Sequence, residues 1–86
     1  MTMYSFTLVL DAAYATDTQM DVVAAASDEL MLGSSNGHAF VAVDREADTL
    51  DIALRSAIID VETALPEIRV LRVEVDRADL DAPTAA

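Results

Sequence analysis

The chain has 86 residues, a net charge of −11, five arginines and no lysine or cysteine. This length holds one domain, and the absence of thiols excludes disulfides and cysteine-based metal sites. Because binding to a nucleic-acid backbone needs Lys or Arg to neutralise phosphates, the acidic balance argues against direct nucleic-acid binding. A basic protein partner, or a contribution of the acids to solubility alone, explains the negative charge better. No apolar run approaches the roughly 18 residues of a membrane helix, so we expect no membrane contact. The apolar N-terminus lacks the positively charged start of a signal peptide and alternates like a strand, so we expect a cytoplasmic protein.

The first predicted elements are a strand and a helix. Residues 3–10 alternate apolar side chains with smaller or polar ones, which is the period of a half-buried strand. Its expected inward face carries Tyr4, Phe6, Leu8 and Leu10. Val9 falls on the opposite face. A helix is expected from Thr16 to about Asp28, because Thr16 and Gln19 have the spacing of a capping box.

A hairpin follows the first helix. The Asn-Gly pair at positions 36–37 favours a type I′ turn, since both residues tolerate positive φ. Residues 29–34 and 38–45 flank this turn and are expected to pair antiparallel. The second of these strands alternates, with Ala39, Val41 and Val43 facing inward. Phe40 and Ala42 then face outward.

A second helix is capped by Asp48 or Thr49 and runs to about Ala64, where a following proline stops it. The residues of its inward face follow i, i+3, i+4 and i+7 spacing. They are Leu50, Ala53, Leu54, Ala57, Ile58 and Val61. Ile52 and Ile59, seven residues apart, lie off this stripe; they either contact a partner or widen the core-facing side of the helix.

The last strand is expected within residues 69–77. Its alternation predicts Leu71, Val73 and Val75 on the inward face. The same alternation predicts Val70, Arg72 and Glu74 on the outward face. Residues 78–86 are expected to be a flexible tail, which leaves 1–77 as the single domain.

The resulting order β-α-β-β-α-β predicts an α+β, ferredoxin-like fold: a four-stranded antiparallel sheet with two helices on one face. We expect right-handed crossovers to place the first and fourth strands in the middle. The alternative is a three-stranded βαβαβ unit in which residues 30–32 remain helical.

The residue types that carry chemistry are present but not arranged for it. The acids at Asp44, Glu46, Asp48 and Asp51 do not have the spacing of an EF-hand loop and suit a helix start. The only histidine, His38, follows a tight turn, and the glycines near it precede a strand rather than a helix. We therefore expect no catalytic residues, no metal and no cofactor.

The uncovered face of the predicted sheet has an apolar centre with polar edges, which is typical of a partner surface. We expect partner or dimer contacts there, most simply in a two-fold homodimer. The residues proposed for this surface are Val9, Phe40, Ala42, Val70 and Arg72.

Three stretches carry a family resemblance. They are "YSFTLVLD" at residue 4, "LGSSNGHAFVAVDREADTLDIALRSAIIDVETA" at residue 32 and "RVLRVEVD" at residue 69. Together they resemble a family of small, largely uncharacterised bacterial proteins whose longer members append a helix-turn-helix segment. The resemblance implies a transcriptional-regulator or antitoxin-like role. This chain ends where that segment would start, and no catalytic residues carry over.

The leading hypothesis is a non-enzymatic, antitoxin-like regulatory module that acts as a homodimer and binds a protein partner. The alternative is a small-molecule sensor that binds its ligand in a groove between subunits, which rests on fold analogy.

Overall fold

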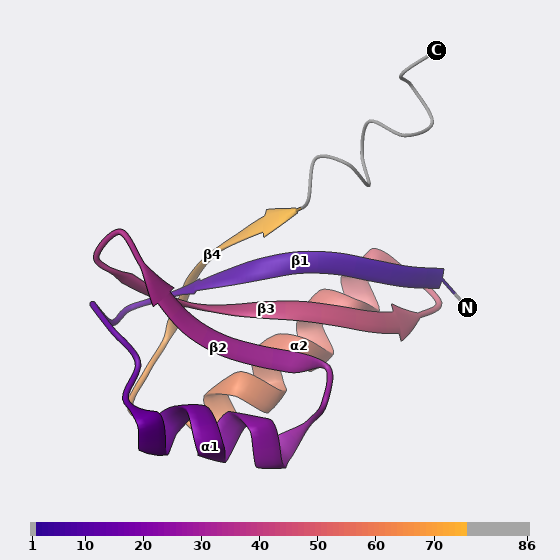
Figure 1. Cartoon of the computed structure of the whole chain (residues 1–86). Helices are drawn as coiled ribbons and strands as arrows, with labels where there is room; N and C mark the ends of the chain where they lie inside the picture. Colours follow the sequence, from indigo (N-terminus) through magenta and orange to yellow (C-terminus); the bar gives the residue numbers. More distant parts are fainter. Residues whose placement is uncertain (1, 76–86) are drawn as a thin grey trace.

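One antiparallel sheet with two helices on one of its faces makes up the structure, a computed structural model that describes residues 2–75 (Figure 1). In chain order the elements are β1 (Thr2–Leu10), α1 (Asp17–Ala26), β2 (Leu30–Ser35), β3 (His38–Ala47), α2 (Leu50–Ala64) and β4 (Val70–Val75). The fold class and element order confirm the predicted α+β architecture. The expected tail at 78–86 and the domain end at residue 77 lie outside the described residues.

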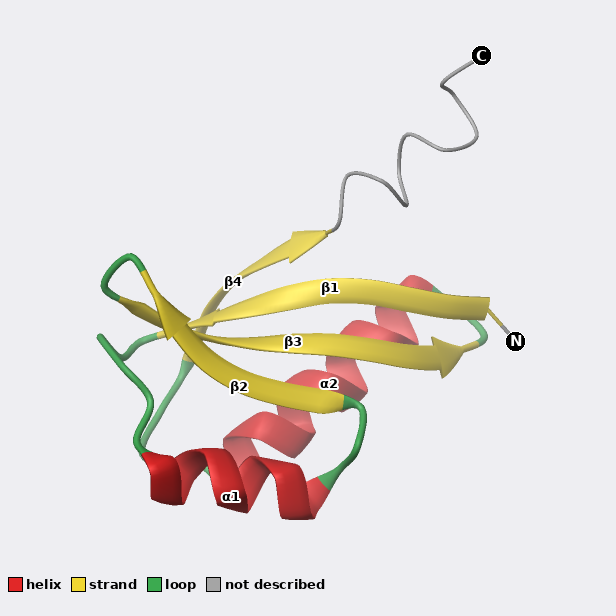
Figure 2. Ribbon diagram, in the orientation of Figure 1, coloured by secondary structure: helices red, strands yellow, loops and turns green. Residues whose placement is uncertain are grey.

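The strand order is β2-β3-β1-β4, so β1 and β3 form the centre of the sheet (Figure 2). The expectation that the fourth strand is central is wrong. The two-residue turn at Asn36 (φ 54°) and Gly37 (φ 80°) forces β3 to lie beside β2. β3 thereby fills the position next to β1, and α2 carries the chain to the free side of β1. Because Leu30–Ser35 is a strand, the three-stranded alternative is also excluded.

The core lies between the sheet and the helices. β1 and β3 contribute alternate residues, as predicted: Phe6, Leu8, Leu10, Ala39, Val41 and Val43 are buried. α2 buries Ala53, Ala57 and Val61, and the two alanines let this helix lie close to the sheet. α1 buries only Val23, so it is held far less firmly than α2.

Both helices begin at the predicted caps. Thr16 Oγ1 accepts a hydrogen bond from the Gln19 amide at 3.1 Å, and the Thr16 amide donates to Gln19 Oε1 at 3.0 Å. This is the complete capping box. At α2, Thr49 rather than Asp48 is the cap, because Thr49 Oγ1 accepts from the Ile52 amide at 3.2 Å.

A β-bulge in β4 changes the predicted facing of two residues. Val9 of β1 pairs with Arg72, whereas Leu10 pairs with Val70, so Leu71 is an extra residue between these pairs. As a result Val70 packs against the core, and Leu71 is 54% exposed. The expectation that Val70 lies on the outward face and Leu71 on the inward face is therefore wrong. Beyond the bulge, Val73 pairs with Leu8 and packs against the core, so it lies on the inward face as predicted.

Candidate interaction surface

The face of the sheet opposite the helices, called here the open face, is not covered by any element within residues 2–75 (Figures 1 and 2). Cross-strand register arranges its side chains in rows across the four strands. One row is Met31, Ala42, Thr7 and Glu74, and the next is Gly33, Phe40, Val9 and Arg72. Three strands that are distant in sequence therefore contribute the residues predicted to share this face, with Val70 as the exception.

Phe40 occupies the centre of the open face. Its ring lies across the neighbouring strand at Gly33, where an added Cβ would lie 3.1 Å from the Cζ of the ring. Next to the ring, Val9 is only 5% exposed although it points away from the core. Phe40 and Ala42 are half-buried. The apolar centre is thus a packed platform rather than a set of freely exposed side chains.

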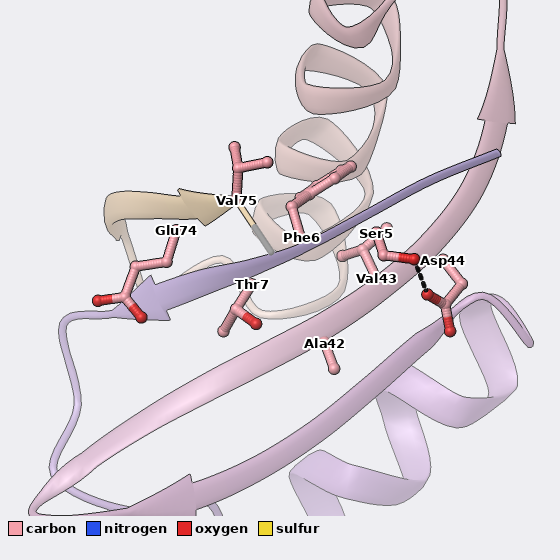
Figure 3. Close-up of a pocket in the computed structure, with 8 residues that line it drawn as sticks. All are labelled: Ser5, Phe6, Thr7, Ala42, Val43, Asp44, Glu74 and Val75. Atoms are coloured by element: carbon pink, nitrogen blue, oxygen red, sulfur yellow. Dashed lines mark hydrogen bonds between the residues drawn. The ribbon is translucent and has the colours of Figure 1, made fainter. Parts of the chain in front are cut away.

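Charged and hydroxyl groups lie around this platform. Ser5 Oγ donates to Asp44 Oδ1 at 2.6 Å, and Figure 3 shows the two side chains pointing toward one another. On β4, Arg72 Nε donates to Glu74 Oε2 at 3.1 Å. The open face therefore has a polar rim, and the arginine that it carries within residues 2–75, Arg72, is already paired to a carboxylate.

Two shallow hollows lie on the open face and share Thr7 and Glu74. The smaller, of about 300 Å³, is the one in Figure 3, where Phe6 and Val75 point to the helix side while Thr7 and Ala42 point away from it. The larger, of about 420 Å³, lies over the platform. It is lined by Thr7, Val9, Ser35, Asn36, His38, Phe40, Arg72 and Glu74. Within the described part of the chain, no three metal-ligating side chains come together.

Met31 belongs to this surface but was missed at the sequence level. This residue of the edge strand β2 is 71% exposed, and it pairs with Ala42 of β3. The signal was present in the run Leu30-Met31-Leu32, because alternation between two buried leucines directs the middle residue to the opposite face.

Ile52 and Ile59 lie elsewhere. Both are exposed, as expected for residues off the inward stripe of α2. α2 lies on the side of the sheet opposite the open face (Figure 1), so the sheet separates this helix from that surface. The structure therefore does not join them with Phe40 into one surface.

A polar cluster around the buried Arg45 lies on the helix side, and sequence reasoning did not find it. Arg45 of β3 is 8% exposed and reaches three acceptors. Its Nε donates to Glu29 at 2.9 Å, its Nη1 to Ser56 Oγ at 2.8 Å and its Nη2 to Asp60 at 2.7 Å. Each of the three guanidinium nitrogens thus donates one hydrogen bond within the fold, and the cluster joins β3 to α2 and to the residue before β2.

Comparisons with known proteins add no assignment to this geometry. No protein-family model, curated protein or solved structure matches the chain. Among the described residues, no helix has both the length and the apolar character needed to cross a membrane.

Proposed function

We propose that this chain is a non-enzymatic, antitoxin-like regulatory module, built on a ferredoxin-like domain, that binds another protein through its open face. The observation that carries the proposal is the packed platform of Phe40, Val9 and Gly33 on an uncovered sheet face. Apolar centres with polar rims are characteristic of protein interfaces, and aromatic residues are enriched in them. The regulatory part of the proposal is supported by the sequence resemblance alone.

The charges around the platform favour a basic partner. Glu74 lies next to it, Asp44 and Glu46 lie further along β3 on the same face, and Arg72 is already paired with Glu74. Two copies stacked through their open faces would bring these acids together, in molecules that each carry a net charge of −11. A basic partner would instead be attracted by the acids of the open face. Such charge complementarity speeds association and disfavours wrong partners. The homodimer through this face, expected from the sequence, stays a prediction.

The test is a binding measurement with a matched pair of charge variants. Basic proteins encoded beside the gene are purified and titrated into the wild type, Phe40→Asp and Ile59→Asp by calorimetry. Phe40→Asp should weaken binding by about tenfold or more, because it places a charge at the interface centre. Ile59→Asp, at a 63% exposed position on the far side of the domain, should bind like the wild type.

Equal binding by all three proteins would contradict the open-face proposal. Loss in Ile59→Asp alone would assign the interaction to α2 instead. Circular dichroism on each variant confirms that folding is retained before the comparison is made.

A second candidate function, small-molecule sensing, is supported by the larger hollow. Its volume of about 420 Å³ falls within the range of about 300–1,000 Å³ that small-ligand sites occupy. A rise in melting temperature with a small molecule, abolished by Phe40→Asp, would favour sensing over protein binding.

A further inference from the structure

The outer edge of β2 has backbone groups without partners. The Asp44 amide donates to the Glu29 carbonyl at 3.1 Å, which sets the alternation of hydrogen bonds between β2 and β3. By that alternation the amide and carbonyl groups of residues 31, 33 and 35 point to β3. Those of Leu32 and Ser34 point outward and have no partner among residues 2–75.

This edge also lacks the features that keep sheet edges from pairing. Leu30–Ser35 contains no charge, no proline and no bulge. The opposite edge, β4, is protected by two of these features. It carries the charged residues Arg72 and Glu74, and it contains the bulge at Leu71. Unprotected edges are templates for a further strand. Only one of the two edges is therefore open to pairing.

Charge identifies another copy of this chain as a suitable occupant. In a protein with a net charge of −11, residues 30–43 contain no Asp or Glu at all, and neither do residues 22–27 of the neighbouring helix and its cap. The acid nearest to this edge in sequence, Glu29, is paired with Arg45, which it shares with Asp60. Two copies can therefore approach along β2 with less like-charge repulsion than through the acid-rimmed open face.

We propose that two copies pair antiparallel through their β2 edges, about a two-fold axis at Leu32, and form one continuous eight-stranded sheet. Leu32 of each copy exchanges two backbone hydrogen bonds with Leu32 of the other, and Ser34 faces Leu30. On the open face, Met31 then stands opposite Gly33 of the second copy, which has no side chain to oppose it. Met31 thereby gains contact with the Phe40 ring that lies over that glycine.

This register also explains the exposure of Met31. A methionine that is 71% exposed in the single chain becomes covered on both sides in the pair. The two open faces meet edge to edge and double the surface offered to a partner. The inference does not rest on the proposed function, because the pairing requires no partner.

The experiment combines oligomeric state with amide exchange on the full chain. Light scattering across micromolar to millimolar concentrations should show a dimer, and the amides of Leu32 and Ser34 should become protected from hydrogen exchange as the dimer forms. Met31→Asp should raise the dimer dissociation constant by about tenfold or more, because two like charges then flank the axis. Leu71→Asp, at the exposed position of the other edge, should dimerise like the wild type.

Three results would overturn the proposal. The first is a monomer at millimolar concentration. The second is a dimer in which the Leu32 and Ser34 amides exchange as freely as in the monomer. The third is a dimer weakened equally by Met31→Asp and Leu71→Asp.

Ser34→Pro provides a second test of the pairing. This substitution removes one outward-pointing amide but no hydrogen bond to β3, so it should also weaken the dimer.

Discussion

Replacing Arg45 with methionine removes the guanidinium while keeping most of the apolar stem. Three hydrogen bonds are lost, to Glu29, Ser56 and Asp60. Breaking a fully buried ion pair costs about 3–5 kcal/mol, whereas breaking an exposed one costs about 0–1 kcal/mol. The arginine side chain here is 9% exposed, but both carboxylate side chains are 44% exposed and regain water. We therefore expect a loss of about 2 kcal/mol, between these limits.

Urea unfolding followed by circular dichroism measures this loss. For a domain of 86 residues the slope is about 1 kcal/mol per molar urea, so the midpoint should fall by about 2 M. The matched control is Arg55→Met, which breaks only the 3.2 Å pair with Asp51 between exposed side chains. That variant should stay within about 0.5 kcal/mol of the wild type.

The reasoning would be refuted if Arg45→Met and Arg55→Met unfolded at the same urea concentration. Burial of the arginine would then contribute nothing beyond an ordinary surface pair. A stabilised Arg45→Met would show that the cost of burying the guanidinium exceeds the gain from its three partners.

Three further substitutions test the caps, the turn and the core, each by thermal or urea unfolding. Thr16→Ala removes the acceptor for the Gln19 amide and should cost about 1 kcal/mol, and an unchanged midpoint would contradict the capping box. Gly37→Ala places a side chain at φ +80° with no atom nearby, so strain alone should cost about 1 kcal/mol; no loss would mean that the turn relaxes freely. Leu8→Ala empties a fully buried position and should cost about 2–5 kcal/mol, and a loss below 1 kcal/mol would show that the core collapses around it.

Periodicity predicted the central elements because their buried faces are continuous. In β3, Ala39, Val41 and Val43 repeat every second residue, and each is buried. The same reasoning failed at the start of β4, where an extra residue, Leu71, reverses the facing of Val70. A bulge depends on pairing with another strand, so an alternating run such as "RVLRVEV" does not reveal it.

The polar cluster around Arg45 also could not be predicted by considering one element at a time. Arg45 stands at an inward position of β3, two residues after Val43, but an arginine is usually expected in solvent. Its acceptors Ser56 and Asp60 lie four residues apart on α2 and become meaningful only once that helix crosses β3.

For the open face, sequence reasoning identified Val9, Phe40, Ala42 and Arg72 correctly as neighbours on one side of the sheet. It overestimated how freely they are exposed, because the Phe40 ring covers Gly33 through cross-strand register.

The pairing of β1 with β4 has a consequence for how the chain folds during synthesis. Thr7 and Glu74 are neighbours in the sheet although 66 residues separate them along the chain. The β2–β3 hairpin, in contrast, closes over two residues and can form early. One side of the central strand β1 stays unpaired until β4 has left the ribosome. The pairing itself then joins segments that are distant in sequence, and such contacts form slowly. The nascent protein therefore passes through a three-stranded stage whose exposed β1 edge is a target for chaperones or misassembly.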